Sequence, residues 1–146
     1  MTPYKNESFA AWFRRHKFRN FTADEFTSYF EVNRRGAQNM APPREMWQNI
    51  LPTLRLVDDL RDHFGRPCVL LSSYRGDEYN RRCGGVKYSQ HRQFTALDIA
   101  VSGVSPKKVF NYLLARRKSG DFKGGLGLYP TFVHLDTRGN NATWGI

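Results

Sequence analysis

Two short segments of this chain alternate between polar, metal-capable side chains and aliphatic ones, and this alternation constrains the fold more than any other feature. In residues 95–101, Asp98 shares a face with two alanines, while the opposite face is aliphatic: Leu97, Ile99 and Val101. In residues 132–136, His134 and Asp136 share one face, and the other carries Val133 and Leu135. A period of two is typical of half-buried strands. The sequence therefore predicts two strands with polar groups on one side of a sheet and a hydrophobic core behind it.

Three residues in and near these strands are candidate metal ligands. His91 precedes Asp98 by seven positions, and His134 lies in the second predicted strand. Two imidazoles and a carboxylate suit a catalytic zinc ion, because three protein ligands leave one tetrahedral position open for water. A His and an Asp at this spacing are common, however. The residues alone leave open that these groups are surface residues or hydrogen-bonded partners.

Further motifs lie in order around the candidate ligands: LLSSYRGDEYN at 70–80, GG at 84–85, SQH at 89–91, GGLGLYP at 124–130 and HLDTRG at 134–139. From about residue 43 to residue 144, this ordered set resembles the zinc D-Ala-D-Ala carboxypeptidase and L-Ala-D-Glu endopeptidase family. Its members are peptidoglycan peptidases with a hedgehog-type α+β fold, and many are phage endolysins or bacterial wall hydrolases.

The resemblance implies that the three candidate residues bind Zn²⁺ and that Arg75 holds a substrate carboxylate or stabilises the developing oxyanion. Arg75 is also a candidate catalytic residue in this second role. On the residues alone, a structural ion pair of Arg75 with Asp77 or Glu78 is an alternative. Ser89 and Gln90 are expected to line the substrate pocket, because they directly precede the first ligand.

The chain departs from the family pattern at two positions. Phe94 stands three residues after the first ligand His, where the family usually has Gly. Thr131 stands three residues before the last ligand, where better-known members carry Glu or Asp as the general base. Because Thr has no useful basicity, we consider Asp136 as the catalytic base. The alternative, that Asp136 orients a ligand or pairs with Arg138, is equally open at this stage.

These features predict an α+β fold in which a small antiparallel sheet carries the zinc site and packs against helices. We expect one peptidase domain over residues 1–146, with an N-terminal helical extension at 1–42 and a catalytic core at 43–146. The length of 146 residues is sufficient for one hydrophobic core. The longest helical pattern runs from Pro43 to about Phe64, and Pro52 is expected to kink or divide it.

Local signals predict the remaining elements. Thr22 and Glu25 form a capping-box pattern before a short helix. Ser105 followed by Pro106 predicts the start of another helix. A short helix is expected at 77–82, and the glycines at 124–127 are expected to permit close packing of strands beside the site.

The net charge of +10 favours an anionic partner. Nucleic acids and bacterial wall polymers are both anionic, but the positive charges are spread along the whole chain and no recognised nucleic-acid motif is present. No apolar run has the length of a signal peptide or a transmembrane helix. We therefore expect synthesis in the cytoplasm without a signal peptide and no transmembrane anchor, while the family resemblance implies action at the bacterial cell wall. The oligomeric state is left open.

The sequence thus predicts a zinc metallopeptidase that hydrolyses peptide bonds in peptidoglycan stem or cross-link peptides. The main alternative is an inactive zinc-binding relative that binds cell-wall peptides or a protein partner, and Thr131 favours it. A small basic nucleic-acid-binding domain and a zinc hydrolase of another kind are further alternatives. Cys68 and Cys83, the only cysteines, are open to pairing with each other, and a catalytic pair of Cys83 with His91 is the weakest alternative.

Overall fold

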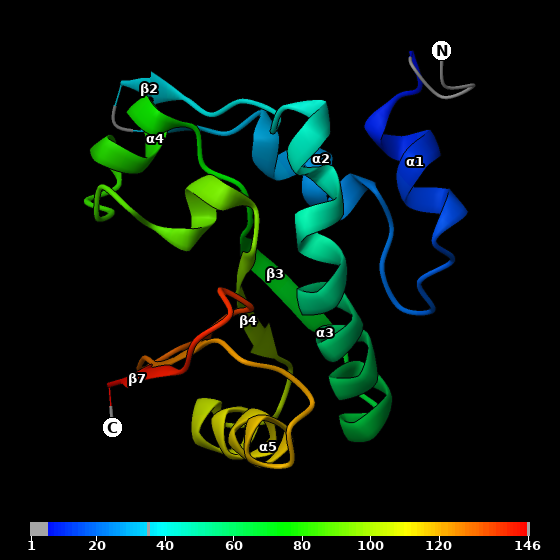
Figure 1. The fold of residues 1–146 in the computed structure, drawn as a ribbon, viewed down its shortest axis with the longest axis vertical. Helices are drawn as coiled ribbons and strands as arrows, with labels where there is room; N and C mark the ends of the chain where they lie inside the picture. Colours follow the sequence, from blue (N-terminus) through cyan, green and yellow to red (C-terminus); the bar gives the residue numbers. More distant parts are fainter. Residues whose placement is uncertain (1–5, 35, 146) are drawn as a thin grey trace.

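A five-stranded sheet with helices packed against it forms the centre of the protein in the computed structural model, which describes residues 6–34 and 36–145 (Figure 1). Residues 1–5 and Arg35 of the predicted N-terminal extension, and Ile146 of the predicted core, lie outside the described residues. The elements in chain order are α1 (Phe9–Arg15), α2 (Asp24–Phe30), β1 (Asn33–Arg34), β2 (Ala37–Gln38), η1 (Arg44–Ile50), α3 (Leu51–Phe64), β3 (Cys68–Ser72), α4 (Asp77–Arg82), η2 (Gln90–Gln93), β4 (Ala96–Val101), α5 (Pro106–Lys118), β5 (Gly125–Leu128), β6 (Val133–Asp136) and β7 (Ala142–Trp144).

The strands of the sheet follow the order β3-β4-β6-β5-β7, and the mixed α+β class is confirmed. The first three pairings are antiparallel, but β5 and β7 are parallel, so the expectation of a purely antiparallel sheet is wrong at this edge. The reason is the short connection at 137–141. It reverses the chain after β6, and β7 then lies on the far side of β5, which itself runs opposite to β6.

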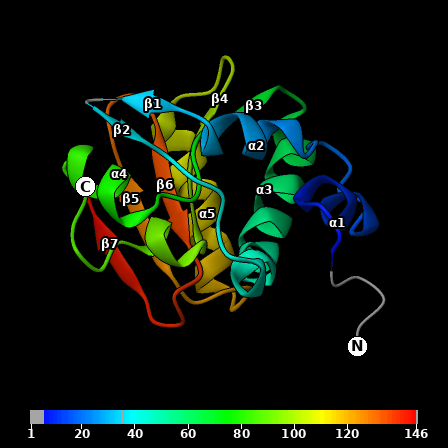
Figure 2. The same cartoon turned by 90° about the horizontal axis from the view of Figure 1, so that it is seen from above.

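The two predicted strands with alternating faces are neighbours in this sheet. Their register places Asp98 opposite His134 and Leu97 opposite Leu135. Leu97, Leu135 and the other aliphatic residues of the pair are fully buried in the hydrophobic core. Helices α3 and α5 pack against the sheet, as Figure 2 shows from above. The opposite side of these strands is therefore free to carry the polar groups.

Pro52 divides the long helical segment as predicted, and a glycine ends it. Pro52 lies in the first turn of α3 and divides it from the 3₁₀ helix η1, because proline lacks the amide proton that the helix interior needs. Gly65 ends α3 with a left-handed backbone, at φ 64°. Ser105 caps α5 by accepting a hydrogen bond from the Lys108 amide. Within residues 6–34 and 36–145, no helix is long and apolar enough to cross a membrane.

The N-terminal helices share one hydrophobic core with the sheet. Phe94, which follows η2, is fully buried, and its ring lies about 6 Å from four others, those of Phe9, Phe26, Phe30 and Tyr74. Phe94 also has a left-handed backbone, at φ 58°. A glycine would adopt this conformation without strain, which explains the family preference at this position. Here the ring compensates for the strain by joining α1 and α2 to the segment that holds His91.

The two roles of Phe94, ring burial and left-handed backbone, predict an unusual order of stabilities. Phe94→Ala should lower the free energy of unfolding by about 3–5 kcal/mol. Phe94→Gly should be about 0.5–1 kcal/mol more stable than Phe94→Ala, because only glycine accepts this backbone freely. Phe26, in the helix α2, is the matched control. There the glycine variant should be the less stable of the two. Urea unfolding of the four variants measures both differences, and the same order at both positions would contradict the assignment.

Candidate metal centre

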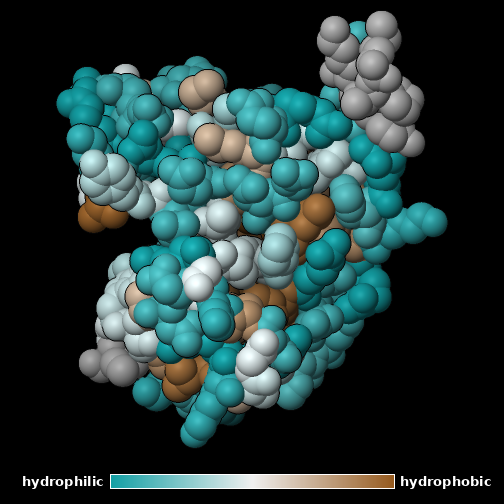
Figure 3. Space-filling view, in the orientation of Figure 1, coloured by the Kyte–Doolittle hydropathy of each residue, from teal (hydrophilic) through white to brown (hydrophobic). Residues whose placement is uncertain are grey.

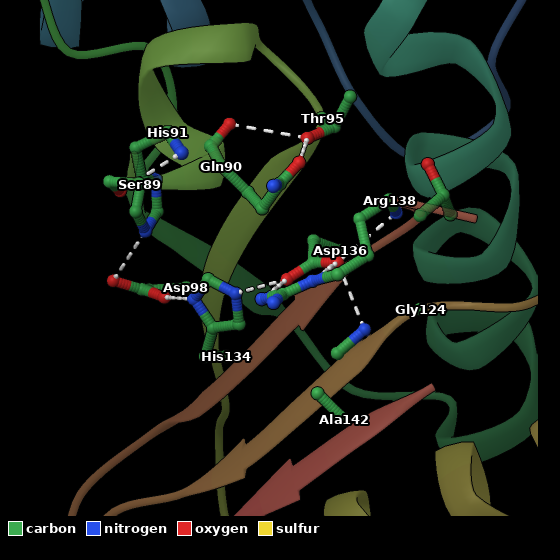
Figure 4. A network of polar contacts seen from close by, with 12 residues as sticks. Ser89, Gln90, His91, Thr95, Asp98, Gly124, His134, Asp136, Arg138 and Ala142 are labelled. Atoms are coloured by element: carbon green, nitrogen blue, oxygen red, sulfur yellow. Dashed lines mark hydrogen bonds and ion pairs between the residues drawn. The ribbon is translucent and has the colours of Figure 1, made fainter. Parts of the chain in front are cut away.

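The short helix η2 carries His91, and a backbone contact orients its ring. Nδ1 of His91 lies 2.7 Å from the carbonyl oxygen of Ser73, at the end of β3. This carbonyl can only accept a hydrogen bond, so Nδ1 carries the proton and Nε2 keeps its lone pair. Nε2 faces Asp98, 3.3 Å from Oδ2 (Figure 4). Ser89 caps the helix by accepting a hydrogen bond from the His91 amide.

Asp98 and His134 complete the group from the adjacent strands β4 and β6. Nδ1 of His134 lies 2.9 Å from Oδ1 of Asp98. One ligand atom from each of the three residues lies within 4.8 Å of the others, and all three residues are buried. The donor set, two imidazole nitrogens and a carboxylate oxygen pointing at one another, is one that zinc takes. The residues therefore fit a single metal ion.

The charges of the group also favour a cation. Burial alone would raise the pKa of Asp98, but hydrogen bonds with His134 and His91 outweigh it and lower the pKa. Burial lowers the pKa of His91, which favours its neutral form. Burial would also lower the pKa of His134, but its hydrogen bonds with Asp136 and Asp98 prevail and raise it. Asp98 is thus kept as a carboxylate, which attracts a positive charge, either the protonated ring of His134 or a metal ion that displaces its proton.

Asp136 lies behind His134 and does not face the cleft. It is fully buried, and Oδ2 lies 2.8 Å from Nε2 of His134. Arg138 binds the same carboxylate through Nε and Nη2, at 2.9 and 2.7 Å, and the Gly125 amide donates to Oδ1 at 2.9 Å. Burial opposes ionisation, but these bonds keep the pKa of Asp136 low. These contacts match the alternative considered from the sequence, in which Asp136 orients a candidate ligand histidine and pairs with Arg138; its role as general base stays a prediction.

The glycines of β5 make room for this arrangement. A Cβ atom at Gly124 would lie 1.7 Å from the backbone oxygen of Asp136, and one at Gly125 would lie 2.5 Å from its Oδ2. At Gly127, a Cβ would collide with the indole of Trp144, which lies beside His134 with ring centroids 5.1 Å apart. The predicted role of this glycine run, close strand packing beside the site, agrees with these distances.

A cleft of about 580 Å³ opens above the metal group. Figure 3 shows the molecule hollowed on this side, between the region of α4 and β2 and the region of β7. Arg75, Ser89 and Gln90, the predicted pocket residues, all line the cleft. Sequence reasoning missed its other wall, which consists of exposed or half-buried residues from loops and from β7: Val86, Tyr88, Tyr129, Phe132, Arg138 and Trp144. Solvent-exposed aromatic residues beside the GGLGLYP motif were the available signal.

Arg75 points toward the metal group and not toward its neighbours in the sequence. Its Nη2 lies 3.8 Å from Oδ2 of Asp98. Asp77 instead pairs with Arg92, and Glu78 pairs with arginines of α4. The structural ion pair considered for Arg75 is therefore replaced by one with a candidate metal ligand.

A family comparison fits this geometry. A family model for Peptidase M15 matches residues 19–136, a span that contains the metal group, Arg75 and Asp136. The chain belongs to the Peptidase M15 family. No curated protein and no solved structure matches it. Peptidase M15 is the zinc D-Ala-D-Ala carboxypeptidase family that the motifs resemble. Because its members are metallopeptidases, membership implies that this chain is a hydrolase that acts on peptides.

The position of the missing acidic residue, Thr131, lies outside the cleft of this Peptidase M15 chain. Thr131 is exposed and does not line the cleft. Among the described residues that line the cleft, Asp98 is the sole carboxylate.

Cys68 and Cys83 do not pair with each other, and burial raises the pKa of the Cys68 thiol to about 12.

The position of Asp136 predicts its effect on metal binding. Asp136→Ala should weaken zinc binding about 10- to 100-fold, because His134 loses the partner that orients its ring. Isothermal titration calorimetry with zinc measures the change. Asp121→Ala removes another arginine-paired carboxylate, at the end of α5 and away from the cleft, and should bind zinc like the unmodified protein. Equal affinity of Asp136→Ala and Asp121→Ala would refute the orienting role.

Proposed function

We propose that this protein is a zinc peptidase that cleaves peptidoglycan stem or cross-link peptides in the cleft above His91, Asp98 and His134. The observation that carries the proposal is this buried group of three ligand side chains, lying below a cleft in a chain of the Peptidase M15 family. Two imidazoles and one carboxylate form a donor set that catalytic zinc takes in peptidases.

Each residue of the site has a role that its contacts support. His91 would hold the metal through Nε2 and His134 through Nδ1, because their other nitrogens face Ser73 and Asp136. When bound, zinc supplies Lewis acidity that polarises a scissile carbonyl and acidifies water. Arg75 presents a guanidinium at the edge of the group, where it would meet a substrate carboxylate or the oxyanion.

The walls of the cleft suit a short acidic peptide. Arg75 and Arg138 provide positive charge, while Tyr129 and Phe132 stack with ring centroids 4.4 Å apart and form a flat apolar surface. Ser89 and Gln90 add polar groups beside the first ligand. Wall peptides carry carboxylates along an amide backbone, and the net charge of +10 would draw the protein to an anionic wall polymer.

A second candidate function is binding of cell-wall peptides without turnover. The absence of a free carboxylate among the described residues of the cleft favours it, because a positioned general base contributes about 10²- to 10⁴-fold to such reactions. The two candidates share the metal and the substrate and differ in hydrolysis alone.

Digestion of whole peptidoglycan sacculi separates the two functions. Zinc-loaded protein should release peptide fragments that mass spectrometry identifies, and a chelator should stop the release. His134→Ala should lose both zinc, measured by elemental analysis, and fragment release. His63→Ala, which changes an exposed histidine of α3 that packs on Tyr112, should keep both. Stoichiometric zinc with intact sacculi would establish the binding protein instead.

Position 131 offers a direct test of the missing base. Thr131→Glu places a carboxylate three residues before His134, where better-known relatives carry one. We expect turnover to rise at least about tenfold, because a carboxylate there can accept a proton from water. Thr131→Gln is the control of similar size without basicity and should leave turnover unchanged. Equal rates for the two variants on sacculi would show that a carboxylate at this exposed position does not act as the base.

A further inference from the structure

Helix α2 brings a tyrosine from the N-terminal segment to the edge of the metal group. The Tyr29 hydroxyl lies 2.8 Å from Oγ of Ser72 and receives a hydrogen bond from Nε of Arg75 at 3.3 Å. Arg75 Nε also donates to Ser72 Oγ at 3.2 Å. Two hydroxyl groups therefore hold one end of the guanidinium, while Nη2 at the other end faces Asp98.

The β3 strand places Ser72 for this contact. The register between β3 and β4 shifts between Leu70 and Ser72, and the shift sets Ser72 opposite Asp98. Ser72 is buried, so its hydroxyl has few partners besides Tyr29 and Arg75. The irregularity in the strand thus brings a hydroxyl to the level of the candidate metal ligand, as bulges beside active sites often do.

Arg75 has space to turn away from the cleft. A second cavity of about 270 Å³ adjoins the first, and both are lined by Arg75, Cys83, Asp98 and Phe132. Tyr29 and Ser72 line the second cavity alone. A guanidinium between two cavities needs fixed partners to keep one orientation, because long side chains otherwise sample several rotamers. The two hydroxyls are those partners.

We propose that Tyr29 is a positioning residue, whose hydroxyl acts with Ser72 to hold the Arg75 guanidinium at the metal group, where it meets the anionic group of the substrate. The inference rests on the proposed peptidase function for its effect on turnover. It also means that residues before 43 belong to the working unit of the site and are more than an added helical segment. Hydrogen bonds to a charged group are strong enough for this purpose.

Tyr29→Phe isolates the hydroxyl. The ring itself packs against Tyr79, edge to face at 6.0 Å, and phenylalanine keeps that contact. Tyr112→Phe is the matched control, because the Tyr112 hydroxyl also accepts a hydrogen bond from an arginine, Nη1 of Arg116 at 2.8 Å, on a helix that does not line either cavity.

The steady-state rate at which peptides are released from sacculi gives the first readout. Tyr29→Phe should lower kcat/KM about tenfold, with zinc content unchanged, while Tyr112→Phe should match the unmodified protein. Methionine is similarly long but has no hydrogen-bond donor, so in an Arg75→Met background Tyr29→Phe should have no further effect. An equal loss in both backgrounds would overturn the proposal, because it would show a general structural effect of the hydroxyl.

The second readout needs no turnover and is independent of the peptidase proposal. In ¹⁵N-labelled zinc-loaded protein, the Arg75 Nε–H signal is identified by its disappearance in Arg75→Lys. Tyr29→Phe should shift this signal and speed its exchange with water, and Tyr112→Phe should leave it in place. An unchanged Arg75 signal in Tyr29→Phe would overturn the positioning role. If Tyr29→Phe shifts the signal but the unmodified protein leaves sacculi intact, the positioning role is supported and only the peptidase function is rejected.

Discussion

The pairing of β4 with β6 is the constraint on which the rest of the site depends. Their register sets Asp98 opposite His134 on one face and Leu97 opposite Leu135 on the other. Because side chains alternate along a strand, a slip of one residue would send the aliphatic side chains into the cleft and the ligands into the core. The hydrophobic core that α3 and α5 build against the sheet thus holds the candidate metal ligands in place.

Burial of so many polar groups requires a partner for each of them. The outer nitrogens of His91 and His134 face Ser73 and Asp136. Asp136 in turn is held by Arg138 (Figure 4) and by the Gly125 amide. The inner nitrogens and Asp98 are left pointing at one another. The surrounding hydrogen bonds therefore fix the tautomer of His91 and the orientations of both rings, and a candidate metal site needs such fixed rings for tight and selective binding.

The two departures from the family pattern have different physical meanings. At Phe94, a strained backbone persists because the ring is the centre of an aromatic cluster that joins the N-terminal helices to the segment of His91. Phenylalanine in place of glycine adds backbone strain at this position and gains contacts in the aromatic cluster. At Thr131, the residue is exposed, and among the described residues that line the cleft no carboxylate stands in for the missing acid beyond Asp98. That second departure bears on chemistry and not on folding.

Features that depend on neighbours along the chain could be predicted from the residues alone. The alternation in two strands, the proline that divides the long helix, the cap at Ser105 and the motif around His91 were all readable, because strand faces and helix ends follow local rules. Contacts between distant segments could be seen in the tertiary structure alone. It turned Asp136 toward His134 and Arg138, made β7 parallel to β5, and brought Tyr29 to an arginine 46 residues away. Such contacts follow from strand register and helix packing. A local sequence pattern therefore does not show which distant residue lies next to a given side chain.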